Sequence, residues 1–154
     1  MTDSFPVLYI LMRNDLESMN PGKAMAQASH ASNAFVFAEL KKMLSTPWKS
    51  VKDFYKVFIK GDTENASLFI QWVHSTTQGF GTVLVLEVDE MRMRTAADIA
   101  DKLDYVSGVV HDPTYPLPDG DFCHFIPLDT CAYVFGDKND QTLAAIVGNF
   151  PLHP

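Results

Sequence analysis

The chain has 154 residues, of which 47% are hydrophobic and 20% charged, as is usual for one soluble globular domain over 1–154. Its net charge of −7 argues against broad nucleic-acid binding, because such proteins usually carry a basic face that neutralises phosphates. Two cysteines do not make a disulfide framework, and nothing in the composition asks for export. We therefore expect a cytoplasmic protein, although a local basic patch is compatible with lysines that gather between 41 and 60.

The first two elements are predicted most clearly. The apolar run FPVLYILMR over 5–13 is rich in strand formers, too short for a membrane span and without a basic leader, so it predicts a buried strand. Asn20 and Pro21 are typical of an N-cap followed by the first helical position. A helix should run from there to about Leu44 and end through Pro47.

The later elements alternate between helices and apolar strands. We expect a short helix within 48–64, a helix over 64–78 opened near Thr63 or Asn65, a strand over 82–88, a helix over 95–104 with Thr95 as its N-cap, a strand over 106–112, a proline-rich loop over 113–122, a strand over 130–136 and a closing helix over 139–150. This order predicts a layered α/β domain whose sheet is mostly parallel, with one hairpin-like pair at the end.

A polar stripe marks the long helix, since Lys23, Gln27, His30 and Ala34 follow one another at helical spacing on one face. Lys23 lies in the first turn, where free N–H groups and the helix dipole already make the potential positive, at a cost of about 0.3–1 kcal/mol. Lysine and helix end would together favour an anion, either a phosphate or an oxyanion. The alternative is a water-facing stripe in which His30 has a structural role.

Four stretches carry a resemblance to a known family: VLYILMRNDLESMNPGKAMAQASHASNAF, SLFIQWVHSTTQGFGTVLVLEV, DYVSGVVHDP and DTCAYVFGDKNDQTLAAIVGNFPL. Together they resemble the archaeal and eukaryotic type (type II) of peptidyl-tRNA hydrolase, of which the chain is identified as a divergent member. The resemblance implies a three-layer-like α/β fold with a four-stranded mixed sheet flanked by helices. It also implies a homodimer that cleaves the ester between a peptide and the terminal ribose of tRNA, without a metal or other cofactor.

The resemblance also implies which residues form the site. Lys23, Asp112 and His30 would be catalytic, and Gln27, Asn20, Thr114, Tyr115 and Thr130 would bind substrate. The residue types suit the reaction, because a carboxylate at a strand end can orient or deprotonate a water and a lysine at a helix N-terminus can hold an oxyanion or a phosphate. Replacing Lys23 or Asp112 by alanine should then abolish hydrolysis and leave thermal stability near that of the wild type.

The sequence departs from the family pattern in three places. Pro21 stands where the family often has a second lysine. After Asp112 the chain reads PTYPLPDG, where the family has Ala-Gly-(Arg/Lys)-Thr-Gln, so that Thr114 or Tyr115 would have to supply the missing hydroxyl. Two insertions, near 48–62 and 121–129, have no family counterpart.

These departures leave alternatives open. The chain can be a hydrolase of peptidyl-tRNA or a related acylated nucleotide, a binding or regulatory protein without turnover, or a hydrolase or transferase with another anionic substrate. Cys123 and His124 suggest a nucleophile pair, but neighbours on an extended chain point in opposite directions. The aromatic and basic residues of 48–62 suit either base stacking or an amphipathic helix on the core.

Overall fold

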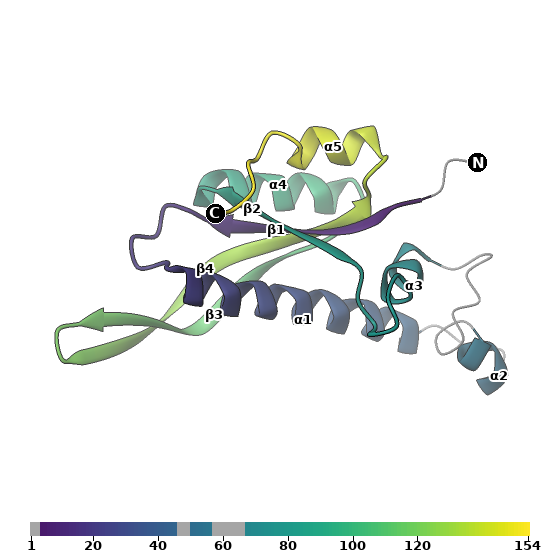
Figure 1. Ribbon diagram of the computed structural model, residues 1–154, viewed down its shortest axis with the longest axis horizontal. Helices are drawn as coiled ribbons and strands as arrows, with labels where there is room; N and C mark the ends of the chain where they lie inside the picture. Colours follow the sequence, from purple (N-terminus) through teal and green to yellow (C-terminus); the bar gives the residue numbers. More distant parts are fainter. Residues whose placement is uncertain (1–3, 46–49, 57–66) are drawn as a thin grey trace.

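The computed structural model describes residues 4–45, 50–56 and 67–154, and shows one four-stranded sheet with helices on both faces (Figure 1). The strands are β1 (Pro6–Arg13), β2 (Thr82–Val88), β3 (Val106–Asp119) and β4 (Phe122–Asp137), and the helices are α1 (Pro21–Ser45), α2 (Val51–Phe54), α3 (Leu68–Val73), α4 (Glu90–Lys102) and α5 (Gln141–Val147). The expected layered α/β fold with a four-stranded mixed sheet is therefore confirmed.

The strand order is β2-β1-β4-β3, and only the β1–β2 pair is parallel. β4 pairs antiparallel with both β1 and β3. The prediction of a mostly parallel sheet is therefore wrong. The reason is that β4 returns directly from β3 through a turn at Gly120, whose φ of 57° suits glycine, and then inserts between β3 and β1.

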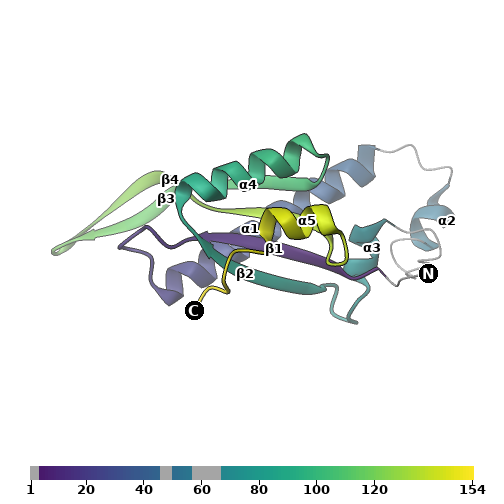
Figure 2. The same cartoon turned by 90° about the horizontal axis from the view of Figure 1, so that it is seen from above.

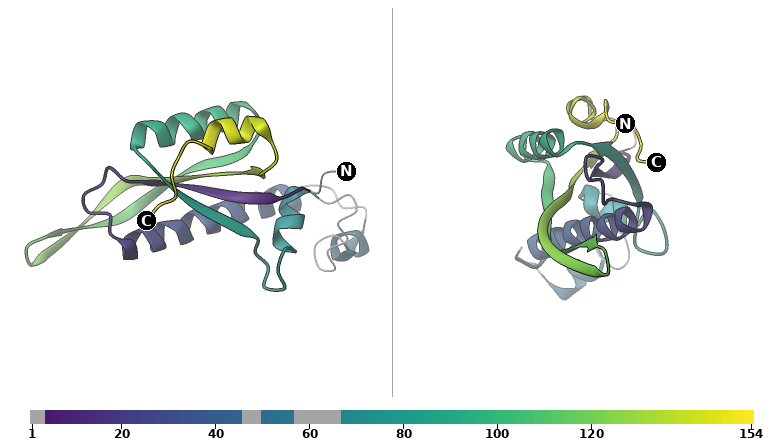
Figure 3. Two further views of the ribbon diagram at one scale, coloured as in Figure 1. Left: turned by 45° about the horizontal axis from the view of Figure 1, so that its top comes forward. Right: turned by 90° about the vertical axis from the view of Figure 1, so that its left-hand side faces the viewer.

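β1 lies inside the sheet, and its side chains alternate between two cores on opposite faces. Val7, Tyr9 and Leu11 pack with α4 and α5, while Leu8, Ile10 and Met12 pack with α1 and α3. Figure 3 shows these two helical layers above and below the sheet. On the α1 side, the Phe35 ring lies 5.4 Å from the Trp72 ring and 4.6 Å from the Phe135 ring, measured between centroids. Burial on both faces explains the continuous apolar run of β1.

The start of α1 agrees with its predicted cap, and the start of α4 does not. The Lys23 N–H donates to Asn20 Oδ1 at 2.9 Å, as an N-cap requires. α4 begins five residues earlier than predicted, because Asp89 caps it by accepting from the Arg92 N–H at 2.8 Å. Thr95 lies inside the helix and donates its hydroxyl hydrogen to the Met91 carbonyl.

The segments between α1 and β2 are described in part. A short helix does occur within 48–64, as α2. α3 is shorter than the predicted helix over 64–78, and Ser67 is its N-cap. The predicted stop at Pro47 and the predicted helix start near Thr63 or Asn65 lie outside the described residues.

The largest difference from prediction is the segment 113–122, which is not a loop. β3 and β4 continue through it as a long two-stranded arm that projects beyond the N-terminal end of α1 (Figures 1 and 2). The predicted insertion over 121–129 is the first half of β4. Three prolines are tolerated here because β3 is an edge strand, where a missing N–H costs no ladder hydrogen bond.

Candidate functional site

A buried hydrogen-bond network joins α1 to the two strands of the hairpin. Gln27 Nε2 donates to Asp112 Oδ2 on β3 at 2.6 Å, and Thr130 Oγ1 on β4 donates to Gln27 Oε1 at 2.6 Å. The exposed fractions are 3% for Gln27, 7% for Asp112 and 0% for Thr130. Buried polar groups need such partners, so the three side chains fix one another's positions.

An irregularity in β3 lets both Asp112 and Tyr115 face inward. The register with β4 shifts between Asp112 and Tyr115, and both of these residues are buried while Pro113 and Thr114 between them are exposed. The Thr114 N–H and hydroxyl both donate to Asp112 Oδ1, at 2.8 and 3.2 Å. A bulge of this kind re-aims side chains and is common beside functional sites.

The network also keeps Asp112 ionised. Burial of its carboxyl would raise the pKa, but hydrogen bonds from Thr114 and Gln27 and the nearby charge of His30 together hold the pKa below its ordinary value. At neutral pH the site therefore contains a fixed, buried negative charge.

Lys23 reaches the same stretch of the hairpin from the first turn of α1. Its Nζ donates to the Pro116 carbonyl oxygen at 2.6 Å and lies 4.8 Å from the centroid of the Tyr115 ring. The Tyr115 hydroxyl in turn lies 3.0 Å from Ser18 Oγ, in the loop before α1. The lysine is thus held beside the network by the arm, while the carboxylate of Asp112 takes its hydrogen bonds from Gln27 and Thr114.

The structure brings six of the eight predicted site residues into one contiguous group: Lys23, Gln27, Asp112, Thr114, Tyr115 and Thr130. The other two lie at its margin. His30 is exposed, and its effect on Asp112 is electrostatic. The side-chain oxygen of Asn20 caps α1 by accepting a hydrogen bond from the Lys23 N–H.

A buried arginine that supports this group is not among the residues predicted from the sequence. Arg13, only 5% exposed, donates to Asp15 Oδ1 at 2.8 Å and to the Asp129 carbonyl at 3.0 Å, and pairs with Glu90 at 3.0 Å. It therefore ties the loop before α1 to α4 and to β4, one residue before Thr130. An arginine that directly follows a buried apolar strand was the available signal.

The alternative Cys123–His124 site is not assembled. Both residues are exposed, and the His124 ring bonds to Asp119 Oδ2 at 3.1 Å. The Cys123 thiol points to the His124 backbone carbonyl rather than to the ring. His111 lies beside Asp112 in sequence, but its ring pairs with Asp129 at 2.7 Å.

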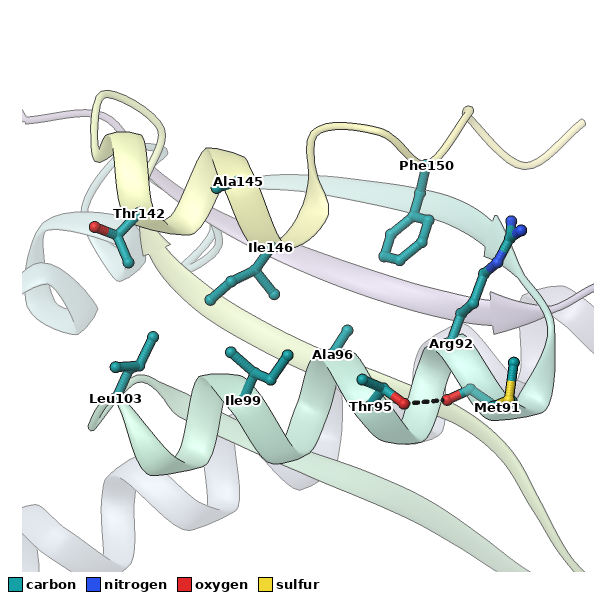
Figure 4. Close-up of a pocket in the computed structure, with 10 residues that line it drawn as sticks. All are labelled: Met91, Arg92, Thr95, Ala96, Ile99, Leu103, Thr142, Ala145, Ile146 and Phe150. Carbon is teal, nitrogen blue, oxygen red and sulfur yellow. Dashed lines mark hydrogen bonds between the residues drawn. The ribbon is translucent and has the colours of Figure 1, made fainter.

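A separate apolar groove lies on the opposite face of the sheet, between α4 and α5 (Figure 4). Its volume is about 550 Å³. Ile99, Leu103, Ile146 and Phe150 point into it, with Arg92 at one end. The described residues contain no group of three or more His, Cys, Asp or Glu that could hold a metal ion, here or at the Asp112 site.

Comparison with known proteins returns one family. The family model of peptidyl-tRNA hydrolase PTH2 matches residues 6–116, well over half of the chain. The matched range includes Lys23, Gln27 and Asp112, whereas Thr130 and the tip of the arm lie beyond it. No curated protein sequence matches the chain significantly.

Proposed function

Because the chain belongs to the peptidyl-tRNA hydrolase PTH2 family, we propose that it hydrolyses the ester between a peptide and the 3′-terminal ribose of tRNA. The observation that carries the proposal is the buried Gln27–Asp112–Thr130 network, with the Lys23 ammonium group held beside it. One negative and one positive group next to a helix N-terminus suit a reaction in which water attacks a carbonyl and negative charge develops on its oxygen.

Asp112 orients the attacking water. An ionised carboxylate offers about four acceptor positions, and three hydrogen bonds occupy Asp112, two from Thr114 and one from Gln27. The remaining position on Oδ2 holds the water against the ester carbonyl. Because its lowered pKa makes Asp112 a weak base, its main contribution is to orient the water and to stabilise the positive charge that the water gains as it attacks, before the water's proton passes to the departing ribose oxygen.

Lys23 stabilises the developing oxyanion. Its ammonium group has three donors, of which one bonds to the Pro116 carbonyl, so that two are available for the oxyanion or for a phosphate of the terminal nucleotide. The N-terminal end of α1 adds to the positive potential. Lys23 and Asp112 are the catalytic residues in this proposal, and His30 lies at the margin of the site, where its charge is the smallest of the effects that lower the pKa of Asp112.

The remaining residues position these two. Gln27 holds Asp112 Oδ2 and is itself held by the Thr130 hydroxyl, and Thr114 holds Oδ1. The Tyr115 ring lies under the Lys23 ammonium, where a cation–π contact favours its present place. Asn20 fixes the first turn of α1 that carries Lys23.

We extend the proposal to the working state, namely a cytoplasmic homodimer in which 1–154 forms one domain, as the family resemblance implies. Among the described residues, none of the helices has the length and apolar character that a bilayer span requires.

A binding or regulatory role without turnover is the second candidate. It is favoured by the contact between Lys23 and Pro116, because Pro116 belongs to the segment that departs from the family pattern and holds the ammonium group in the structure. A substrate would have to share this lysine with the arm.

The deciding experiment measures release of the blocked amino acid from N-acetyl-aminoacyl-tRNA by the purified protein, by Lys23→Ala and by Asp112→Asn. Lys102→Ala is a control, because Lys102 is exposed on α4, in the layer on the other face of the sheet. We expect turnover by the wild type and the control and severe loss in both site variants. No release by the wild type would exclude hydrolysis and leave the binding role.

A further inference from the structure

The helical stripe of α1 that starts at Lys23 continues past the site to the other end of the helix. Its members, at steps of three or four residues, are Lys23, Gln27, His30, Ala34, Phe37 and Lys41. Lys23 and Lys41 are 18 residues apart and therefore on the same side of the helix, and a rise of 1.5 Å per residue separates them by about 27 Å. One flank of α1 thus begins at the proposed active site and ends at a second lysine.

At the far end of this flank, the exposed ring of Phe37 makes a cation–π contact with Lys41. Phe37 is 65% exposed, whereas Phe35, two residues earlier on the same helix, is fully buried in the core. The Lys41 Nζ lies 5.5 Å from the centroid of the Phe37 ring. The core does not use Phe37, and an exposed ring beside a lysine is what proteins use to stack a base and contact the phosphate next to it.

The charge of α1 is opposite to that of the whole chain. The helix carries Lys23, Lys41 and Lys42 but one acidic residue, Glu39, which pairs with Lys42 at 2.9 Å. Glu39 also lies off the stripe, since it is two residues from both Phe37 and Lys41. In a chain with a net charge of −7, this flank is a place where a polyanion can approach.

We propose that this flank of α1, from Lys23 to Lys41, binds the RNA of the substrate, with a base stacked on Phe37 and a phosphate at Lys41. The proposal rests on the proposed function, because it places the ester at Lys23 and Asp112. A span of about 27 Å is longer than one nucleotide, so the flank would hold a run of single-stranded RNA that ends at the ester. Phe37 and Lys41 therefore contact unpaired nucleotides upstream of the terminal one, whose bases are free to stack.

The first test compares a long and a short substrate. N-acetyl-aminoacyl-tRNA reaches both ends of the flank, whereas the same blocked amino acid on adenosine alone reaches only the Lys23 end. We expect Phe37→Ala and Lys41→Ala each to raise KM for the tRNA ester about fivefold or more, with kcat unchanged and with no effect on the short ester. Lys102→Ala is the matched control and should change neither.

Changes of equal size on both substrates, or no change on the tRNA ester, would overturn the inference. Because both side chains are exposed, the two variants should melt within about 2 °C of the wild type, and a larger shift would assign them a structural role instead.

A second test does not need catalysis. Binding of deacylated tRNA is titrated over a range of salt concentrations, and Lys41→Ala should lower the slope of log K against log salt by about one. An unchanged slope contradicts the inference. If the slope falls in Lys41→Ala but the wild type hydrolyses neither ester, the proposed function is wrong and the RNA-binding flank is supported. If the wild type hydrolyses the ester but the slope is unchanged in Lys41→Ala, the proposed function is supported and the RNA-binding flank is wrong.

Discussion

The Nζ atom of Lys23 donates to the carbonyl oxygen of Pro116 at 2.6 Å. This contact joins the first turn of α1 to the projecting part of β3, four residues past Asp112. The oxygen is available because β3 is an edge strand with no neighbour on its outer side. The site is therefore assembled between a helix and a long hairpin, and its lysine is positioned by the arm and not by the carboxylate.

Replacing Lys23 by alanine should lower kcat for N-acetyl-aminoacyl-tRNA by about 10²–10³-fold, the usual effect of removing an oxyanion donor. Stability should fall by about 1 kcal/mol or less, because the variant loses one hydrogen bond from a half-buried side chain. Single-turnover kinetics and urea unfolding measure the two effects. Wild-type kcat in a folded variant would remove Lys23 from the chemistry.

Asp112→Ala should reduce both activity and stability, which revises the expectation from sequence that stability would stay near wild type. The substitution leaves the buried amide of Gln27 without its acceptor, at a cost of about 1–3 kcal/mol in unfolding free energy. Asp112→Asn keeps the shape but loses the charge, so it should lose turnover with a smaller stability change. Comparable stability in Asp112→Ala and the wild type would show that the network is weaker than its geometry indicates.

Gln27 and Thr130 should be energetically coupled, because the Thr130 hydroxyl donates to the amide oxygen that orients Gln27 toward Asp112. Gln27→Leu, Thr130→Val and the double variant form a thermodynamic cycle that urea unfolding can measure. We expect a coupling of about 0.5–3 kcal/mol, as for contacting buried groups. Additive effects would mean that the two side chains act independently.

Ionised Asp112 should make stability fall in acid. The folded-state pKa of Asp112 is below its ordinary value of 3.8, because the hydrogen bonds that it accepts outweigh its burial. Below about pH 4 the unfolded chain therefore binds more protons than the folded chain. The contribution of ionised Asp112 to the free energy of unfolding is complete above that pH and is lost as the pH falls through the lowered pKa. Urea unfolding from pH 5 downward should show a shallower loss in Asp112→Asn than in the wild type. An equal pH dependence would assign the acid sensitivity to other carboxylates, such as Asp129.

The two cysteines should differ in reactivity. Burial raises the pKa of the Cys131 thiol to about 12, so that this thiol stays protonated at pH 8, whereas Cys123 is exposed on the arm. A colourless disulfide reagent that releases a chromophore should label one thiol quickly and the second only after denaturant is added. Cys123→Ser should remove the fast phase, and fast labelling that persists would show that the end of α1 over β4 opens readily.

The elements that sequence predicts well are those whose signal is local. A continuous apolar run gives β1, and the Asn20–Pro21 pair gives the start of α1. The start of α4 was misplaced because two residues offered a cap. Asp89 is the N-cap, while the Thr95 hydroxyl lies inside the helix and donates to the Met91 carbonyl. Local sequence cannot decide between such caps, since the choice depends on how much of the helix can pack on the sheet.

The site was predictable as a set of residues but not as a geometry. The family pattern identified side chains from a helix and two strands that the fold brings together, namely Lys23, Gln27, Asp112 and Thr130. The bulge after Asp112 and the carbonyl of Pro116 have no side-chain signature, and three prolines in PTYPLP are typical of a loop. Only the position of β3 at the sheet edge makes that composition compatible with a strand.

The prolines of the arm have one further consequence. A long edge strand that projects into solvent would normally recruit strands from other molecules and promote aggregation. Pro113, Pro116 and Pro118 offer no N–H groups for such pairing, so the outer side of β3 is a poor template for a second chain along this stretch. The arm thus projects beside the reactive groups with one of its two edges closed to strand pairing.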